Sequence, residues 1–142
     1  MLKELLNNRC RIQLENVEMK ALKDPAEDVS GVEVLVTDSL ACKKKADSLH
    51  VECTRKVGFE PACNFEITVT YSVDHYLKEL DMLDNVPMET IEQEVRQNIP
   101  FYIQEKRGLM NRVSLLIAQL TSSFEGAPLI LPPYYQTEET ER

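Results

Sequence analysis

Alternating apolar and polar residues mark two strands in the middle of the chain. From Phe65 to Val73 every second residue is apolar and the residues between are polar, which is typical of a strand with one buried and one solvated face. The segment from Leu49 to Phe59 alternates in the same way, except that Arg55 falls on the otherwise apolar face. The stretch Gly58–Asn64, which contains Pro61, is predicted to connect the two strands as a hairpin.

Two further strands are predicted upstream. Val32 to Val36 form one strand, and a loop containing Lys43 to Asp47 should join it to the next. In the first strand, Cys10 to Lys20, the apolar residues change parity near Asn16, and a β-bulge would produce that change. Four consecutive strands with short links imply an antiparallel meander, whose apolar face must be covered.

The cover is predicted from Met88 onward, where apolar residues recur every three or four positions along one long helix. Pro87 suits the first helical turn. Pro100 has no N–H group and should kink the helix or break it into two, at a cost of about 3 kcal/mol in a straight helix. Gly108 is a second weak point. The predicted fold is therefore α+β, a four-stranded antiparallel meander covered on one face by a long proline-kinked helix, in a single domain over residues 1–142.

Composition narrows the range of partners. The chain has 142 residues with a formal net charge of -8 and 43% hydrophobic residues, which is typical of a globular protein. Because a net negative charge repels phosphate groups and anionic lipids, neither nucleic acid nor membrane insertion is predicted. The amino terminus has no continuous apolar stretch of the kind a secretory signal needs, so we expect a cytoplasmic protein with reduced thiols.

No grouping of residues with specific catalytic chemistry is present. The sequence contains no nucleophile elbow, phosphate-binding glycine loop or zinc-protease motif, so we predict no enzyme, no catalytic residue, no metal and no cofactor. His50 and His75 are predicted to be solvated strand residues. A nucleophilic pair of Cys53 with His75 stays open at this stage, because sequence does not reveal spatial proximity.

Two apolar segments lie where polar turns are expected. They could be loops folded onto the core, or adaptable surfaces that bind varied apolar partners. The first follows the last strand and the second follows the helix; together they form the predicted peptide-binding groove of Tyr76, Leu77, Leu80, Met82, Leu83, Leu131, Tyr134 and Tyr135.

The order of elements and the segment Phe124–Pro133, read as FEGAPLILPP, resemble the bacterial protein-export chaperone family SecB. A helix that ends in glycine, followed by prolines and leucines, is the family's pattern. The segment Phe65–Ile67 is similar to the strand that leads into the family's hydrophobic crossover loop. The likeness covers roughly Arg11 to Tyr135 and implies a shorter, divergent SecB-like branch.

The resemblance also implies partners. The family's acidic contact to the tail of the export motor SecA would fall on Glu66, although Asn16 replaces a family aspartate and Asn64 a family leucine. Only nine residues follow Pro133, where the family has a second helix over the client groove. The resemblance therefore leaves two points undecided: whether the protein docks to SecA, and whether a helix covers its client groove.

The leading functional hypothesis is a SecB-like holdase that binds unfolded or extended polypeptide through apolar grooves, with preproteins for export as one class of client. The alternative is an oligomeric scaffold or adaptor of the same fold that binds no client. In both cases the exposed edge of the first strand, together with off-stripe helix residues such as Leu115 and Arg112, predicts a homodimer or a dimer of dimers.

Overall fold

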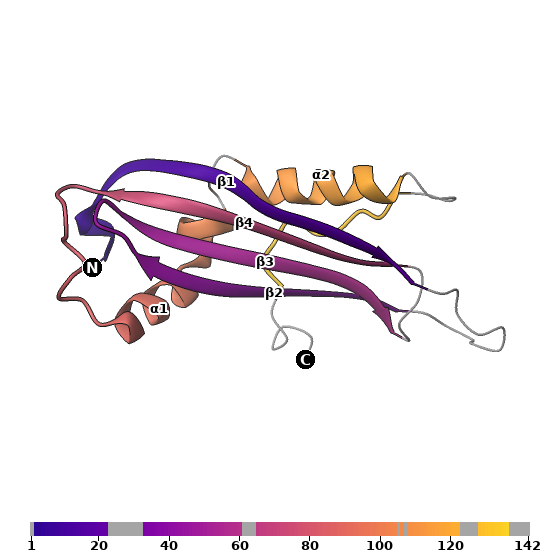
Figure 1. Cartoon of the computed structure of the whole chain (residues 1–142), viewed down its shortest axis with the longest axis horizontal. Helices are drawn as coiled ribbons and strands as arrows, with labels where there is room; N and C mark the ends of the chain where they lie inside the picture. Colours follow the sequence, from indigo (N-terminus) through magenta and orange to yellow (C-terminus); the bar gives the residue numbers. More distant parts are fainter. Residues whose placement is uncertain are drawn as a thin grey trace.

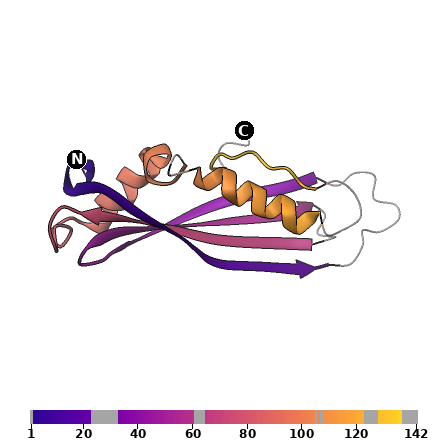
Figure 2. The same ribbon diagram turned by 90° about the horizontal axis from the view of Figure 1, so that it is seen from above.

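The computed structural model describes residues 2–22, 33–60, 65–104, 106, 108–122 and 128–136. Within these ranges, a layer of strands carries the helices on one face, and no helix covers the other face (Figures 1 and 2). The elements in chain order are η1 (Leu2–Leu5), β1 (Leu6–Ala21), β2 (Glu33–Lys44), β3 (Ser48–Glu60), β4 (Phe65–Leu77), α1 (Met88–Gln97), η2 (Pro100–Gln104) and α2 (Leu109–Thr121).

The four strands pair antiparallel in the order β1-β4-β3-β2. The predicted α+β fold with a four-stranded antiparallel sheet is confirmed, but the simple meander is wrong, because β1 lies beside β4 rather than beside β2. β4 has the most buried side chains of the four strands. A meander would leave this strand at an edge, whereas pairing it with both β1 and β3 places it in the interior of the sheet.

Three local predictions for the strands can be checked. The register of β1 against β4 shifts between Leu14 and Asn16, which confirms the predicted bulge. The expected lysine loop is shorter than predicted, because Lys43 and Lys44 belong to β2 and only a tight turn from Lys45 remains before β3. Gly58 lies inside β3 rather than in the hairpin connection.

The predicted single helix is broken into pieces at the two weak points of its sequence. α1 follows Pro87 and ends at Gln97, and the turn that begins at Pro100 is a short π-helix. Pro100 has no N–H to donate to the carbonyl of Arg96, and the amides of Phe101 and Tyr102 both donate to the carbonyl of Asn98. α2 begins after Gly108, whose φ of 69° lies in the left-handed region that favours glycine.

The π-helix η2 is held to the sheet by a buried histidine. His75 on β4 is 3% exposed, and its Nε2 donates to the carbonyl of Tyr102 at 2.8 Å. The ring of Phe101 stacks on His75, and the ammonium of Lys106 lies 4.0 Å from the centre of the Phe101 ring. The prediction that His75 is solvated is therefore wrong. Burial lowers the pKa of His75 to about 4.

Arg55, the residue that interrupts the apolar pattern of β3, lies in the core with no exposed surface and is paired with Asp38 of β2. Its Nε and Nη2 donate to the two carboxylate oxygens of Asp38 at 3.0 and 2.9 Å. Nη1 and Nη2 also donate to the carbonyls of Pro132 and Tyr134, at 3.1 and 2.6 Å. One buried ion pair thus joins two strands to the segment that follows α2.

Some predictions fall outside the described residues. These are the strand residue Val32, the hairpin residue Pro61, the family position Asn64, and the Phe124–Ala127 part of the SecB-like motif.

Asp38→Ala should lower the free energy of unfolding by about 3–5 kcal/mol, because it leaves the guanidinium of Arg55 buried without its counter-ion. Urea unfolding of the variant measures this loss. Glu18→Ala, which removes an exposed carboxylate from β1, is the matched control and should change stability by less than about 0.5 kcal/mol. Equal losses in the two variants would contradict the role of the buried pair.

The free energy of unfolding should fall as the pH drops from about 6.5 to about 4, because the unfolded chain protonates His75 at the higher pH and the folded chain only near the lower. The buried histidine contributes up to about 3 kcal/mol to this loss. His75→Gln offers Tyr102 an amide donor in its place and does not titrate, so urea unfolding at several pH values should show a flatter profile for the variant. Parallel profiles would refute the assignment.

Candidate functional site

An open apolar groove lies between strand β1 and helix α2, on the face of the sheet that carries the helices. Its volume is about 260 Å³. β1 and β4 supply its floor and α2 its wall, through the residues Ile12, Gln13, Leu14, Tyr71, Leu109, Arg112, Val113 and Leu116. Leu14 is 57% exposed although it points to the covered face, because α2 does not extend across β1. We call this feature the β1–α2 groove.

The groove lies beside an edge of the sheet. β1 has a neighbour only in β4 among the described strands, so its other side presents backbone N–H and C=O groups without a strand partner. Val17, which has the same orientation as Leu14 after the bulge, is also exposed. Apolar side chains next to free backbone groups form a surface that suits an extended polypeptide.

The other flank of α2 is filled by the chain itself. Residues 128–136 run over the sheet between α2, η2 and β2, and Leu131 is buried there. The segment is tied to α2 by Leu129, whose amide donates to the hydroxyl of Thr121 at 2.8 Å. The two flanks of α2 therefore differ, one being occupied by an extended segment and one being open.

The structure places the eight predicted groove residues in two separate regions. Tyr134 contacts Arg55 through its carbonyl, whereas Tyr76 pairs with Ser48, seven residues away along β3. At about 3.3 Å per residue this is about 23 Å along the strand. The expectation that the two apolar segments lie near each other is therefore wrong.

The eight residues also differ in accessibility. Leu77, Leu83 and Leu131 are buried in the core, so they are corrected from groove residues to packing residues. Tyr76, Met82 and Tyr135 are half-buried, and only Leu80 and Tyr134 are well exposed, at 69% and 59%. A peptide-binding role for the accessible members stays a prediction.

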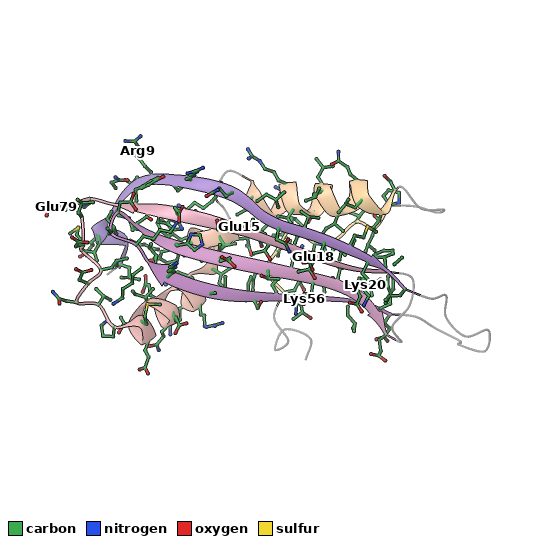
Figure 3. The ribbon with its side chains drawn as sticks, viewed as in Figure 1. Arg9, Glu15, Glu18, Lys20, Lys56 and Glu79 are labelled. Atoms are coloured by element: carbon green, nitrogen blue, oxygen red, sulfur yellow. The ribbon has the colours of Figure 1, made fainter. Side chains whose placement is uncertain are left out.

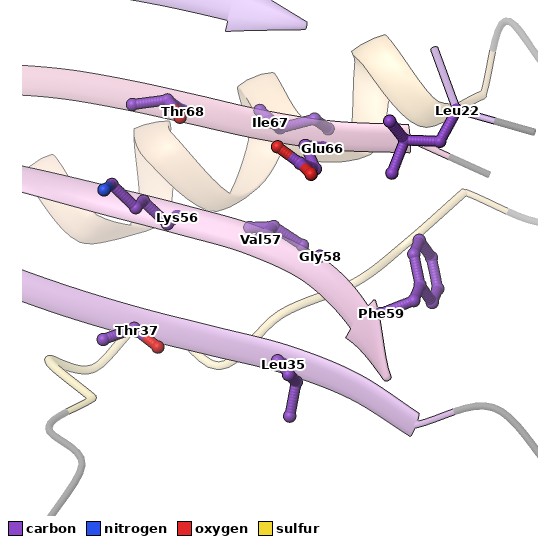
Figure 4. A pocket seen from close by; sticks show the side chains of 10 residues that line it. All are labelled: Leu22, Leu35, Thr37, Lys56, Val57, Gly58, Phe59, Glu66, Ile67 and Thr68. Atoms are coloured by element: carbon purple, nitrogen blue, oxygen red, sulfur yellow. The ribbon is translucent and has the colours of Figure 1, made fainter. Parts of the chain in front are cut away.

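Glu66, the predicted contact to SecA, is exposed on the open face of the sheet. It lines a shallow pocket of about 220 Å³ together with Lys56 (Figure 4), and its cross-strand partner on β1 is Lys20. Charged side chains of this face, among them Glu15, Glu18, Lys20 and Lys56, are labelled in Figure 3. Because two lysines flank Glu66, the local charge offers little attraction to a basic partner segment.

The described residues do not assemble a nucleophilic pair of Cys53 and His75. His75 pairs with Leu49, four residues from Cys53 along β3, which corresponds to about 13 Å. Burial raises the pKa of the Cys53 thiol to about 12, and burial together with Glu92 raises that of Cys42 to about 11. Both thiols are therefore protonated at neutral pH and are weak nucleophiles.

Polar residues on the open face form a compact cluster instead. His50 Nδ1 lies 2.6 Å from an oxygen of Asp74, and Nε2 lies 3.3 Å from Glu52. Lys45 reaches the same Asp74 oxygen at 3.4 Å. His50 is thus half-buried and partnered, and the prediction that it is solvated is wrong. Within the described ranges, no group of three or more histidines, cysteines or acidic residues is arranged to hold a metal ion.

The β1–α2 groove was missed at the level of sequence. Its apolar residues include Leu14, within the predicted first strand, and Leu116, within the predicted helix. Periodicity gives the face on which a side chain lies, but it does not show how far the covering helix extends over that face. The off-stripe residues Arg112 and Leu115 are exposed, as expected.

Comparison with known proteins supports the fold resemblance. No protein-family model matches the chain, and no curated protein matches it in sequence. Among solved structures, the SecB-like chaperone Rv1957 of Mycobacterium tuberculosis is similar in fold, with a TM-score of 0.60, 15% sequence identity and 92% of each chain covered. That structure is a complex with a ChAD peptide from the Rv1956 HigA1 antitoxin. The chain therefore has a SecB-like fold.

No helix within the described ranges is long and apolar enough to cross a membrane.

Proposed function

We propose that this protein is a SecB-like holdase that binds unfolded or extended polypeptides without catalysis or cofactor, with the β1–α2 groove as its open binding surface. The observation that carries the proposal is this apolar groove beside the free edge of β1. Apolar contact contributes about 25 cal/mol per Å² buried, and the main chain of a client can bond the strand edge. The fold shared with a chaperone that was solved with a bound peptide supports the same function.

The charge of the protein suits this role. The net charge of -8 opposes non-specific aggregation through the exposed apolar residues, and it attracts clients with basic segments. The proposal includes one SecB-like domain over residues 1–142 and a cytoplasmic location. Preproteins for export are one class of client, and docking to SecA through Glu66 stays a separate prediction.

A scaffold that only self-associates is the second candidate. The same exposed edge of β1, with Leu14 and Val17 accessible beside it, could pair with β1 of a second copy and extend the sheet to eight strands. In this case the apolar surface is an interface between copies, and no client is bound.

The double variant Leu14→Ser and Leu116→Ser distinguishes the two functions. For a holdase, its affinity for a permanently unfolded, carboxymethylated protein should fall at least about thirtyfold, because two apolar contacts of roughly 1–2 kcal/mol each are lost. Suppression of client aggregation should fall in parallel, while light scattering gives an unchanged mass.

Leu80→Ser tests the predicted groove in the crossover segment between β4 and α1 separately, since Leu80 is 69% exposed there. It should bind the unfolded protein within twofold of the wild type. If only Leu80→Ser loses binding, the crossover segment is the site. A wild type that binds no unfolded chain, with a double variant that loses its assembly, supports the scaffold instead.

A charged substitution on β1 tests whether two copies of the chain pair through the edges of their β1 strands. In the scaffold alternative, where a second copy occupies the β1 edge, the wild type should scatter light as a dimer or a dimer of dimers of the 16.3 kDa chain. Val17→Lys replaces an exposed apolar side chain at this edge by a positive charge on both copies and should shift the mass toward that of the monomer at micromolar concentration. Leu35→Lys is the control, since Leu35 is similarly exposed on the other edge strand, β2. A wild type with the mass of one chain would refute this assembly.

A further inference from the structure

Residues 128–136 lie on the covered face of the sheet as an extended segment with a regular alternation of side chains. Leu131 is buried, and its alternate neighbours Leu129, Pro133 and Tyr135 are half-buried. The residues between them are exposed: Pro128, Ile130, Pro132 and Tyr134. The segment therefore lies on the sheet as a strand does, with every second side chain turned inward.

The polar contacts that hold this segment to the sheet and η2 are made with its main chain. Arg55 donates to the carbonyls of Pro132 and Tyr134, two residues apart. The amide of Tyr135 donates to Oε1 of Gln104 at 3.0 Å. The amide of Gln136 donates to a carboxylate oxygen of Asp38 at 2.6 Å, and the carbonyl of Gln136 accepts from the amide of Asp38 at 2.7 Å.

These contacts require little of the amino-acid sequence of the bound segment. Any extended chain presents carbonyls two residues apart, and any residue except proline supplies the N–H groups at the last two positions. The inward side chains at alternate positions need only be apolar. The guanidinium of Arg55 and the carboxylate of Asp38 are both buried, so they need a main chain over them to complete their hydrogen bonds.

We propose that this region, between α2 and β2, is a second binding site for extended polypeptide with alternating apolar residues, and that residues 128–136 are its resident ligand. A client displaces the segment, so client binding and docking of the segment exclude each other. This inference rests on the proposed holdase function. It adds a second site, on the flank of α2 opposite the β1–α2 groove. Because residues 128–136 compete with clients for this site, the apparent affinity for clients is lowered.

A variant of the segment tests the competition. Gln136→Pro removes the amide that donates to Asp38 and leaves Arg55, Asp38 and Gln104 intact. Because the site is then free in a larger fraction of molecules, a fluorescent peptide with the sequence of residues 128–136 should bind the variant about tenfold more tightly than the wild type. Gln136→Ala keeps the amide and is the matched control, which should bind the peptide within twofold of the wild type.

Modified peptides test the main-chain contacts. N-methylation of the peptide at the positions of Tyr135 and Gln136 removes both N–H donors and should weaken its binding to the Gln136→Pro variant at least tenfold. Serine at the inward positions of Leu129 and Leu131 should also weaken it, whereas serine at the outward position of Ile130 should not. Equal binding of the N-methylated and unmodified peptides would overturn the assignment.

The two proposals can fail separately. If the wild type suppresses aggregation but excess peptide neither binds the variant nor displaces an unfolded client, the holdase function stands and the second site is wrong. If the peptide binds but no unfolded protein does, the holdase function is wrong. A lower assembly mass for Gln136→Pro would mean that the segment docks onto a second copy, which also overturns displacement by clients. Should Gln136→Pro fail to fold, peptide competition on the wild type decides.

Discussion

The arrangement of the described residues depends on one buried ion pair, Arg55 with Asp38. Burial of two charges costs several kcal/mol per ion unless hydrogen bonds satisfy them. Here the guanidinium makes four bonds, two to the carboxylate and two to main-chain carbonyls. The carboxylate also accepts the amide of Gln136. A charge in the core is thus compatible with folding because β2, β3 and an extended main chain over them, here the segment after α2, meet at this point.

Because of this constraint, the inner face of the sheet is covered differently near β2 and near β1. On the β2 side, α1 and residues 128–136 cover the inner face, and the ion pair fixes the segment in place. On the β1 side, α2 leaves Leu14 and Val17 accessible next to the strand edge. The helix pieces follow from Pro100 and Gly108, whose backbone limits divide one amphipathic stripe into separate elements that cover different strands. The open groove is therefore a consequence of how the cover is divided.

Much of this fold could be predicted from local rules. Alternation located β3 and β4, a change of parity located the bulge in β1, and proline and glycine located the breaks in the helix. The order of the strands could not be predicted in this way, because alternation shows on which face of the sheet a side chain lies and not which strand pairs with it. Arg55 was visible as an interruption, but its partner Asp38 was not, since the pair forms only when β2 and β3 align. For the same reason Leu77 and Leu80 could not be told apart, although one is buried and the other exposed.

An exposed strand edge beside apolar residues is normally an aggregation hazard, and the sequence of β1 shows how this is limited. Its exposed positions include Arg9, Arg11, Glu15, Glu18 and Lys20. Charges of both signs on an edge strand disfavour pairing with an arbitrary folded edge, because each mismatch of like charges is destabilising. A flexible extended chain can adjust its register to avoid such mismatches, and it can place apolar side chains over Leu14. Under the proposed holdase function, the edge would therefore accept unfolded polypeptide in preference to folded strands.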